Sequence, residues 1–157
     1  MRKRIIAPIR HDAAPLDQEW LNPEGLAEVE ITSEDAAYPI EAALLPVAAA
    51  GWRAAGPGVQ TIRLLFAQPQ RLRRIRLMFV EEHWQRTQEY VLRWSADGGR
   101  SFQEIVRQQW TFSPQGATCE TEEHHVELPA VTLLELTITP NISGGEAIAS
   151  LQQLRLA

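Results

Sequence analysis

Apolar side chains recur at every second residue in a series of short segments, and this feature most restricts the fold. The segments 62–66, 75–79, 90–94 and 134–138 show it most clearly. Successive side chains of an extended strand point to opposite faces, so a period of two places one face in a core and the other in solvent. The pattern therefore predicts half-buried β-strands.

The same pattern, with turn residues between segments, continues through most of the chain. The predicted strands are 28–31, 61–66, 74–79, 90–95, 102–110, 118–128, 134–138 and 151–156. Only residues 41–45 resemble a helical turn, whereas parallel strands need long crossover connections, usually helices. We therefore predict an all-β fold, an eight-stranded antiparallel β-sandwich or a related barrel.

The length of 157 residues suits one domain with a core of its own. Residues 1–25 are rich in Pro, Asp and Ala and are predicted to be an irregular lead-in, with Trp20 and Leu21 fastening it to the rest. Residues 26–157 are predicted to form the β-sandwich domain.

The net charge and the cysteine content restrict which binding partners and which cellular compartment we expect for the chain. The formal net charge of -5 argues against nucleic acid or an anionic membrane surface, because both are bound mainly by Lys and Arg. The basic start is interrupted by Pro8 and Arg10 before a signal peptide could form, and no apolar run approaches a membrane span. We expect a cytoplasmic protein in which the lone cysteine, Cys119, is a small packed thiol.

Antiparallel strands run from one end of a sandwich to the other, so alternate loops share an end. The connections 33–58, 81–87, 111–117 and 140–146 are predicted at one end, and the short turns 67–71, 96–100 and 129–130 at the other. The long connections carry nearly all the unusual side chains. Since binding residues concentrate on loops held by a rigid scaffold, this end is the predicted recognition surface.

Several motifs resemble the discoidin, or coagulation factor V/VIII C-type, family of galactose-binding-like jelly-roll domains. The residues that carry the resemblance are 30–34, Trp52, 60–64, 75–77, the run Tyr-Val-Leu-Arg-Trp-Ser-Ala-Asp-Gly-Gly at 90–99 with Phe102 behind it, and 149–156. The resemblance implies a jelly-roll fold and a non-catalytic binding module. Many members of the family bind sugars, while others bind lipid head groups or proteins.

A second resemblance leaves the partner open. Residues 52–55, Trp-Arg-Ala-Ala, running into Gln-Thr-Ile at 60–62, look like the amino-terminal domain of a eukaryotic single-strand-break repair scaffold. That domain has the same fold and binds a protein. Carbohydrate binding and cytoplasmic protein–protein interaction are therefore both carried forward, because a fold alone does not define a ligand.

The chain departs from the family at its metal site. Sugar-binding members often hold a structural Ca²⁺ with an Asp-rich loop and a Glu of the last strand. Here residues 48–51 read Ala-Ala-Ala-Gly, and Gln153 stands where that Glu is expected. Calcium needs several oxygen ligands, carboxylates above all. We expect no cofactor, with structural calcium as the less favoured alternative.

The loop 81–86 supplies the best candidate site, with His83, Trp84 and Arg86. An exposed indole offers a flat apolar platform, and His and Arg donate hydrogen bonds to hydroxyls or carboxylates. Arg53 and Trp110, at the same predicted end, are further ligand-binding candidates. In the alternative interpretation Trp84 only caps the sandwich and Arg86 pairs with a nearby Glu.

Residues 120–125 form the densest ionisable cluster, but strand alternation divides it. Glu122 and His124 point one way while Glu123 and His125 point the other, so too few ligands converge for a metal ion. The adjacent Glu81 and Glu82 diverge on an extended backbone and cannot flank one bond. The sequence predicts a binding module and not an enzyme.

Overall fold

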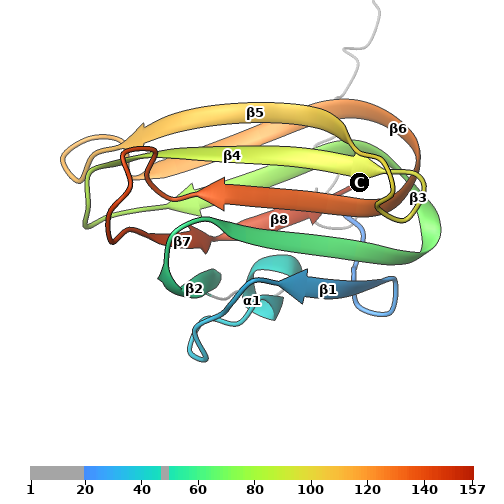
Figure 1. The fold of residues 1–157 in the computed structure, drawn as a ribbon, viewed down its shortest axis with the longest axis horizontal. Coiled ribbons are helices and arrows are strands. Elements are labelled where there is room, and N and C mark those ends of the chain that lie inside the picture. Colours follow the sequence, from blue (N-terminus) through green and yellow to red (C-terminus); the bar gives the residue numbers. More distant parts are fainter. Residues whose placement is uncertain (1–19, 47–49) are drawn as a thin grey trace, which may run out of the picture.

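A computed structural model of the chain describes residues 20–46 and 50–157. The elements in these residues are β1 (Ala27–Ile31), α1 (Glu41–Leu44), β2 (Trp52–Pro57), β3 (Gln60–Val80), β4 (Arg86–Ser95), β5 (Gln103–Phe112), β6 (Cys119–Thr139), β7 (Ile148–Leu151) and β8 (Gln153–Leu156) (Figure 1). All pairings between these strands are antiparallel. The predicted all-β, eight-stranded antiparallel sandwich and its helical turn are confirmed. The described helix, α1, is too short to cross a membrane.

The strands β3 and β6, of 21 residues each, form one long ribbon that folds over at a corner (Figure 1). Its first part joins the layer β1–β3–β6–β4–β5, with Ile62 opposite Leu136. Its second part pairs with β8, with Leu77 opposite both Glu122 and Leu154. The sequence predicts turns at 67–71 and 129–130. The structure instead carries both strands through these segments with shifts of register.

The two layers meet over a core of alternating inward side chains. Phe79 of β3 stacks on Tyr90 of β4, with ring centroids 5.2 Å apart. The Tyr90 hydroxyl is hydrogen-bonded to Nε2 of His124 on β6, at 2.8 Å. Tyr90 and Phe79 are both fully buried. Burial of a large apolar side chain contributes ~1.5–3 kcal/mol, so this interlayer packing is a main source of stability.

The predicted connection 33–58 contains a strand that the sequence pattern did not indicate. In β2, Trp52 and Arg53 lie opposite Leu151 and Ser150 of β7. Trp52 is buried, as expected of a structural tryptophan, and its indole nitrogen donates to the backbone oxygen of Ser33 at 3.1 Å. Small residues hide the alternation, because only Trp52 offers a large apolar side chain in this strand.

Two expectations concern the ends of the chain and its cysteine. Residues 1–19 of the predicted lead-in lie outside the described residues. Leu21 donates its backbone N–H to the Leu156 oxygen at 2.7 Å, and Arg74 covers the Trp20 ring at 4.5 Å.

The expected packing of Cys119 is wrong: this residue is exposed, because Glu120 takes the inward position at the start of β6.

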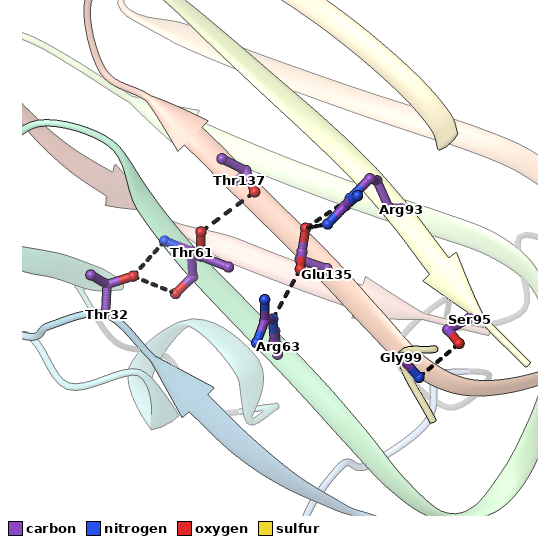
Figure 2. A network of polar contacts seen from close by, with 8 residues as sticks. All are labelled: Thr32, Thr61, Arg63, Arg93, Ser95, Gly99, Glu135 and Thr137. Atoms are coloured by element: carbon purple, nitrogen blue, oxygen red, sulfur yellow. Dashed lines mark hydrogen bonds and ion pairs between the residues drawn. The ribbon is translucent and has the colours of Figure 1, made fainter. Parts of the chain in front are cut away.

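A row of charges crosses the outer face of the larger layer (Figure 2). Glu135 of β6 is buried between two arginines, with Arg63 of β3 at 2.9 Å and Arg93 of β4 at 2.6 Å. The same register places Glu30 opposite Arg63 and Glu104 opposite Arg93. Opposite charges on facing positions stabilise strand pairs, so the row helps to set the register of the sheet.

Replacing Glu135 by Ala leaves two guanidinium groups without their shared acceptor. We expect Glu135→Ala to lower the free energy of unfolding by about 1–3 kcal/mol, since both arginines are partly exposed and retain some hydration. Urea denaturation measures the change. Arg71→Ala, which removes the exposed pair with Glu127, serves as a control with an expected loss below about 1 kcal/mol. Equal losses in the two variants would contradict this role of Glu135.

Candidate functional site

Two of the predicted long connections, 81–87 and 140–146, line a pocket of about 400 Å³ at one end of the sandwich. Its walls come from the loop between β3 and β4, the segment between β6 and β7, and the β2–β7 ribbon. Backbone hydrogen bonds hold two of these segments to their neighbours, from Glu81 N to Thr118 O just before β6 at 2.8 Å and from Ile142 N to Thr87 O of β4 at 2.9 Å. The volume lies within the range of about 300–1,000 Å³ that is usual for small-molecule sites.

Trp84 is the most exposed large apolar side chain of the described residues, at 72% of its surface. It lines the pocket together with His83, whose backbone N–H donates to the Glu81 carboxylate at 3.3 Å. An indole so exposed contributes little to the core, and its flat face is available to a ligand. The capping alternative therefore does not describe Trp84.

Arg86 lines the same pocket but is only 4% exposed. Its guanidinium donates to Glu81 at 2.9 Å, to the backbone oxygen of Pro140 at 2.8 Å and to the Gln88 side chain at 3.2 Å. It also lies 5.0 Å from the Phe112 ring centroid. The geometry agrees with the predicted alternative of an Arg86–Glu pair, and Arg86 joins the loop after β3 and the loop after β6 to the end of β5 beneath the pocket.

Arg53 and Trp110, the other two candidates, lie in different places. Arg53 is exposed on β2, stacks over the Tyr38 ring at 4.7 Å and lines the pocket beside its register partner Ser150. Trp110 is half-buried on β5 opposite Gln88 and does not line the pocket. The structure thus brings four of the five predicted residues together: His83, Trp84, Arg86 and Arg53.

Other pocket residues escaped the sequence interpretation or had little weight in it. Asn141, Gln85, Glu146 and Ser150 also line the pocket. Polar residues in loops carry no periodicity, so no sequence signal sets them apart. The apolar rim residues Ile142, Ile148 and Val59 are also exposed at this end; Pro57, next to the turn that holds Val59, is the register partner of Ile148.

A second polar group lies inside the sandwich, where Glu120, Glu122 and His124 point inward from β6. Glu120 is 1% exposed, and neither of its carboxylate oxygens meets a hydrogen-bond donor within the described residues. Burial raises the pKa of Glu120 to about 7, and the neighbouring Glu122 adds to this effect. Burial likewise raises the pKa of Tyr90, while it lowers that of His124 against the opposing effect of Glu122. Within the described ranges, no three such side chains are arranged to hold a metal ion.

Comparison with known proteins identifies the fold. No protein-family model matches the chain, and no curated protein matches it in sequence. Solved structures do match, among them the family 32 carbohydrate-binding module of Clostridium perfringens NanJ in complex with galactose. That structure is 13% identical and has a TM-score of 0.57, and the match covers 85% of this chain and 95% of that one.

Two further structures show the same likeness. The third family 32 module of a family 31 glycoside hydrolase from Clostridium perfringens is 15% identical, with a TM-score of 0.62 and coverage of 90% and 96%. The family 32 module of AlyQ in complex with 4,5-unsaturated mannuronic acid is 16% identical, with a TM-score of 0.55 and coverage of 84% and 95%. This chain has the discoidin-like, galactose-binding-like fold. The predicted fold resemblance is thereby confirmed.

Because the carboxyl group of Glu120 is buried, we expect the stability of the protein to depend on pH in an unusual way. The pKa of Glu120 is near 7 in the folded protein and about 4.3 in an unfolded chain. The folded state therefore binds more protons between these values, and stability decreases as pH rises through this window. We expect Glu120→Gln to raise the free energy of unfolding at pH 8 by on the order of 2 kcal/mol relative to its effect at pH 5.

Urea denaturation at several pH values, for the wild type and Glu120→Gln, measures this difference. Subtracting the two curves cancels the contribution of His124, whose lowered pKa acts in the opposite direction. Glu127→Gln, on an exposed position of the same strand, is the matched control and should leave the pH dependence unchanged. A Glu120→Gln curve parallel to that of the wild type would contradict this prediction, because it would mean that folding does not raise the pKa of Glu120.

Proposed function

We propose that this protein is a non-catalytic carbohydrate-binding module that holds a sugar or a similar small polar ligand in the pocket at the loop end. The observation that carries the proposal is the exposure of Trp84 in the wall of a pocket of about 400 Å³. A sugar ring has one relatively apolar face and a polar edge. The indole suits the first, and the surrounding amide, hydroxyl and charged groups suit the second.

The pocket residues take distinct roles in this proposal. Trp84 is the stacking platform, while His83 and Asn141 donate hydrogen bonds to ligand hydroxyls. Arg86 is a positioning residue, because its donors are directed to Glu81, Pro140 and Gln88. The carbohydrate-binding modules among the matched structures support binding without reaction. The structural neighbours with galactose and with unsaturated mannuronic acid support a carbohydrate ligand for this fold.

Removing the indole tests the proposal. A panel of mono- and oligosaccharides is titrated against the protein while tryptophan fluorescence is recorded, and each hit is repeated by calorimetry. We expect Trp84→Ala to weaken binding of any hit at least about tenfold, because the stacked surface is lost, and Trp84→Phe to restore part of it. Trp84 is exposed, so thermal stability should not change.

Val29→Ala, which trims an exposed apolar side chain on β1, is the control and should bind like the wild type. If no sugar of the panel binds the wild type, or if Trp84→Ala binds a hit as tightly as the wild type, carbohydrate binding at this pocket is refuted.

A second candidate function is a cytoplasmic protein–protein interaction module that uses the same end. It is favoured by the exposed apolar side chains Val59, Ile142 and Ile148 at the same end as Trp84, since aromatic and apolar groups concentrate at binding hot spots. Pull-down from cell lysate, with and without the panel sugars, separates the two candidates. A stoichiometric protein partner that resists sugars and is lost in Ile148→Asp supports this function. A partner retained by Ile148→Asp contradicts it.

A further inference from the structure

Arg53 differs from the other charged groups of the pocket in how its side chain is held. It is exposed on β2, and its guanidinium stacks over the Tyr38 ring at 4.7 Å. Backbone hydrogen bonds from Arg53 N to Tyr38 O at 3.2 Å and from Asp35 N to Arg53 O at 2.8 Å fix the two segments together. Stacking uses the face of the guanidinium and leaves the donors around its edge available.

Some charged side chains of the pocket are paired with each other, and Arg53 is not paired with a carboxylate. Arg86 and Glu81 neutralise each other in a contact of 2.9 Å. Within residues 20–46 and 50–157, no carboxylate lies in ion-pair contact with Arg53. Arg53 is therefore a cation of the pocket wall whose charge no described carboxylate balances.

The pocket wall carries different chemical groups at different places. Arg53 lies opposite Ser150 on the β2–β7 ribbon, so a guanidinium and a hydroxyl stand side by side at one part of the wall. Glu146 lines the pocket from the segment before β7, beyond the Pro57–Ile148 pair of the ribbon. A ligand with an anionic group at one end and hydroxyl donors at the other would match both parts.

We propose that the ligand is an acidic sugar, with its ring on Trp84 and its carboxylate bound by the guanidinium of Arg53. This inference rests on the proposed function and names the ligand class of the same pocket. The planar guanidinium edge matches a carboxylate with two parallel N–H···O bonds. Hydroxyl groups of the sugar would donate to Glu146. A phosphate or sulfate ester can also accept two guanidinium N–H bonds, so both esters are compared directly with the carboxylate; a phosphate monoester also brings a larger charge towards Glu146.

Matched pairs of sugars test the inference, because each pair differs only at one carbon. Galacturonate is compared with galactose and glucuronate with glucose, together with the methyl esters of both uronates and with galactose 6-sulfate and galactose 6-phosphate. We expect at least one uronate to bind about tenfold or more tighter than its neutral partner and its ester. This preference should diminish as salt concentration rises.

Variants then assign the preference to one side chain. Arg53→Met should weaken the binding of uronates about 10- to 100-fold and the binding of neutral sugars by a clearly smaller factor, whereas Arg53→Lys should retain part of the preference. Tyr38→Leu should reduce it less than Arg53→Met, because Tyr38 only positions the guanidinium. Arg71→Met removes an exposed arginine that pairs with Glu127 outside the pocket lining, and should bind like the wild type.

The outcomes separate this inference from the function on which it rests. If neutral sugars bind and depend on Trp84, but uronates bind no tighter and Arg53→Met changes nothing, the acidic ligand is refuted while carbohydrate binding stands. A stronger preference for the sulfate or phosphate ester also refutes the carboxylate assignment. If no sugar binds the wild type, both fail. Thermal unfolding of each variant, with unchanged midpoints expected, excludes misfolding as the cause of a loss.

Discussion

The fold depends on two long strands that change layers. Because β3 and β6 both continue through the corner near 67–71, with shifts of register, each strand contributes to both layers and holds the layers together. This continuity brings Phe79 and Tyr90 into contact across the core and places β4 beside β6 in one layer and β8 beside β3 in the other. The opposite end, where the ribbon opens, is left to the long loops. The position of the loop-end pocket thus follows from the strand pairing.

Arg86 converts that loop end into a defined pocket. Its contacts with Glu81 and Pro140 connect the loop after β3 with the one after β6, and the Phe112 ring beneath it belongs to the end of β5. Buried charges are costly unless paired, so this network has few alternative arrangements. The Arg86 network thus supports the loop that carries Trp84, while the β2–β7 pairing and Tyr38 hold Arg53, so both side chains are held before a ligand binds and the ordering cost of binding is small.

Periodicity predicted the layers and the loop end well, because most inward positions are large and apolar. It failed where side chains are small or charged. β2 was hidden because its inward residues after Trp52 are small, and the parity at the start of β6 was misjudged because Glu120, and not Cys119, faces the core. The candidate site was predicted by residue type and loop position alone. These two criteria selected Trp84 and Arg53, which line the pocket, but they also selected Trp110, which does not. They could not predict Ser150, because its place in the pocket wall depends on the pairing of β7 with β2, where Ser150 lies opposite Arg53.

The central claim is that the loop-end pocket, and not another surface, receives the ligand. The indole N–H signals of the five tryptophans report on this directly in a two-dimensional NMR titration with galacturonate or galactose. The account predicts that the Trp84 signal shifts with saturation, while the buried Trp52 and the half-buried Trp110 stay in place. A saturable shift confined to Trp110, or binding that leaves Trp84 unmoved, would contradict it.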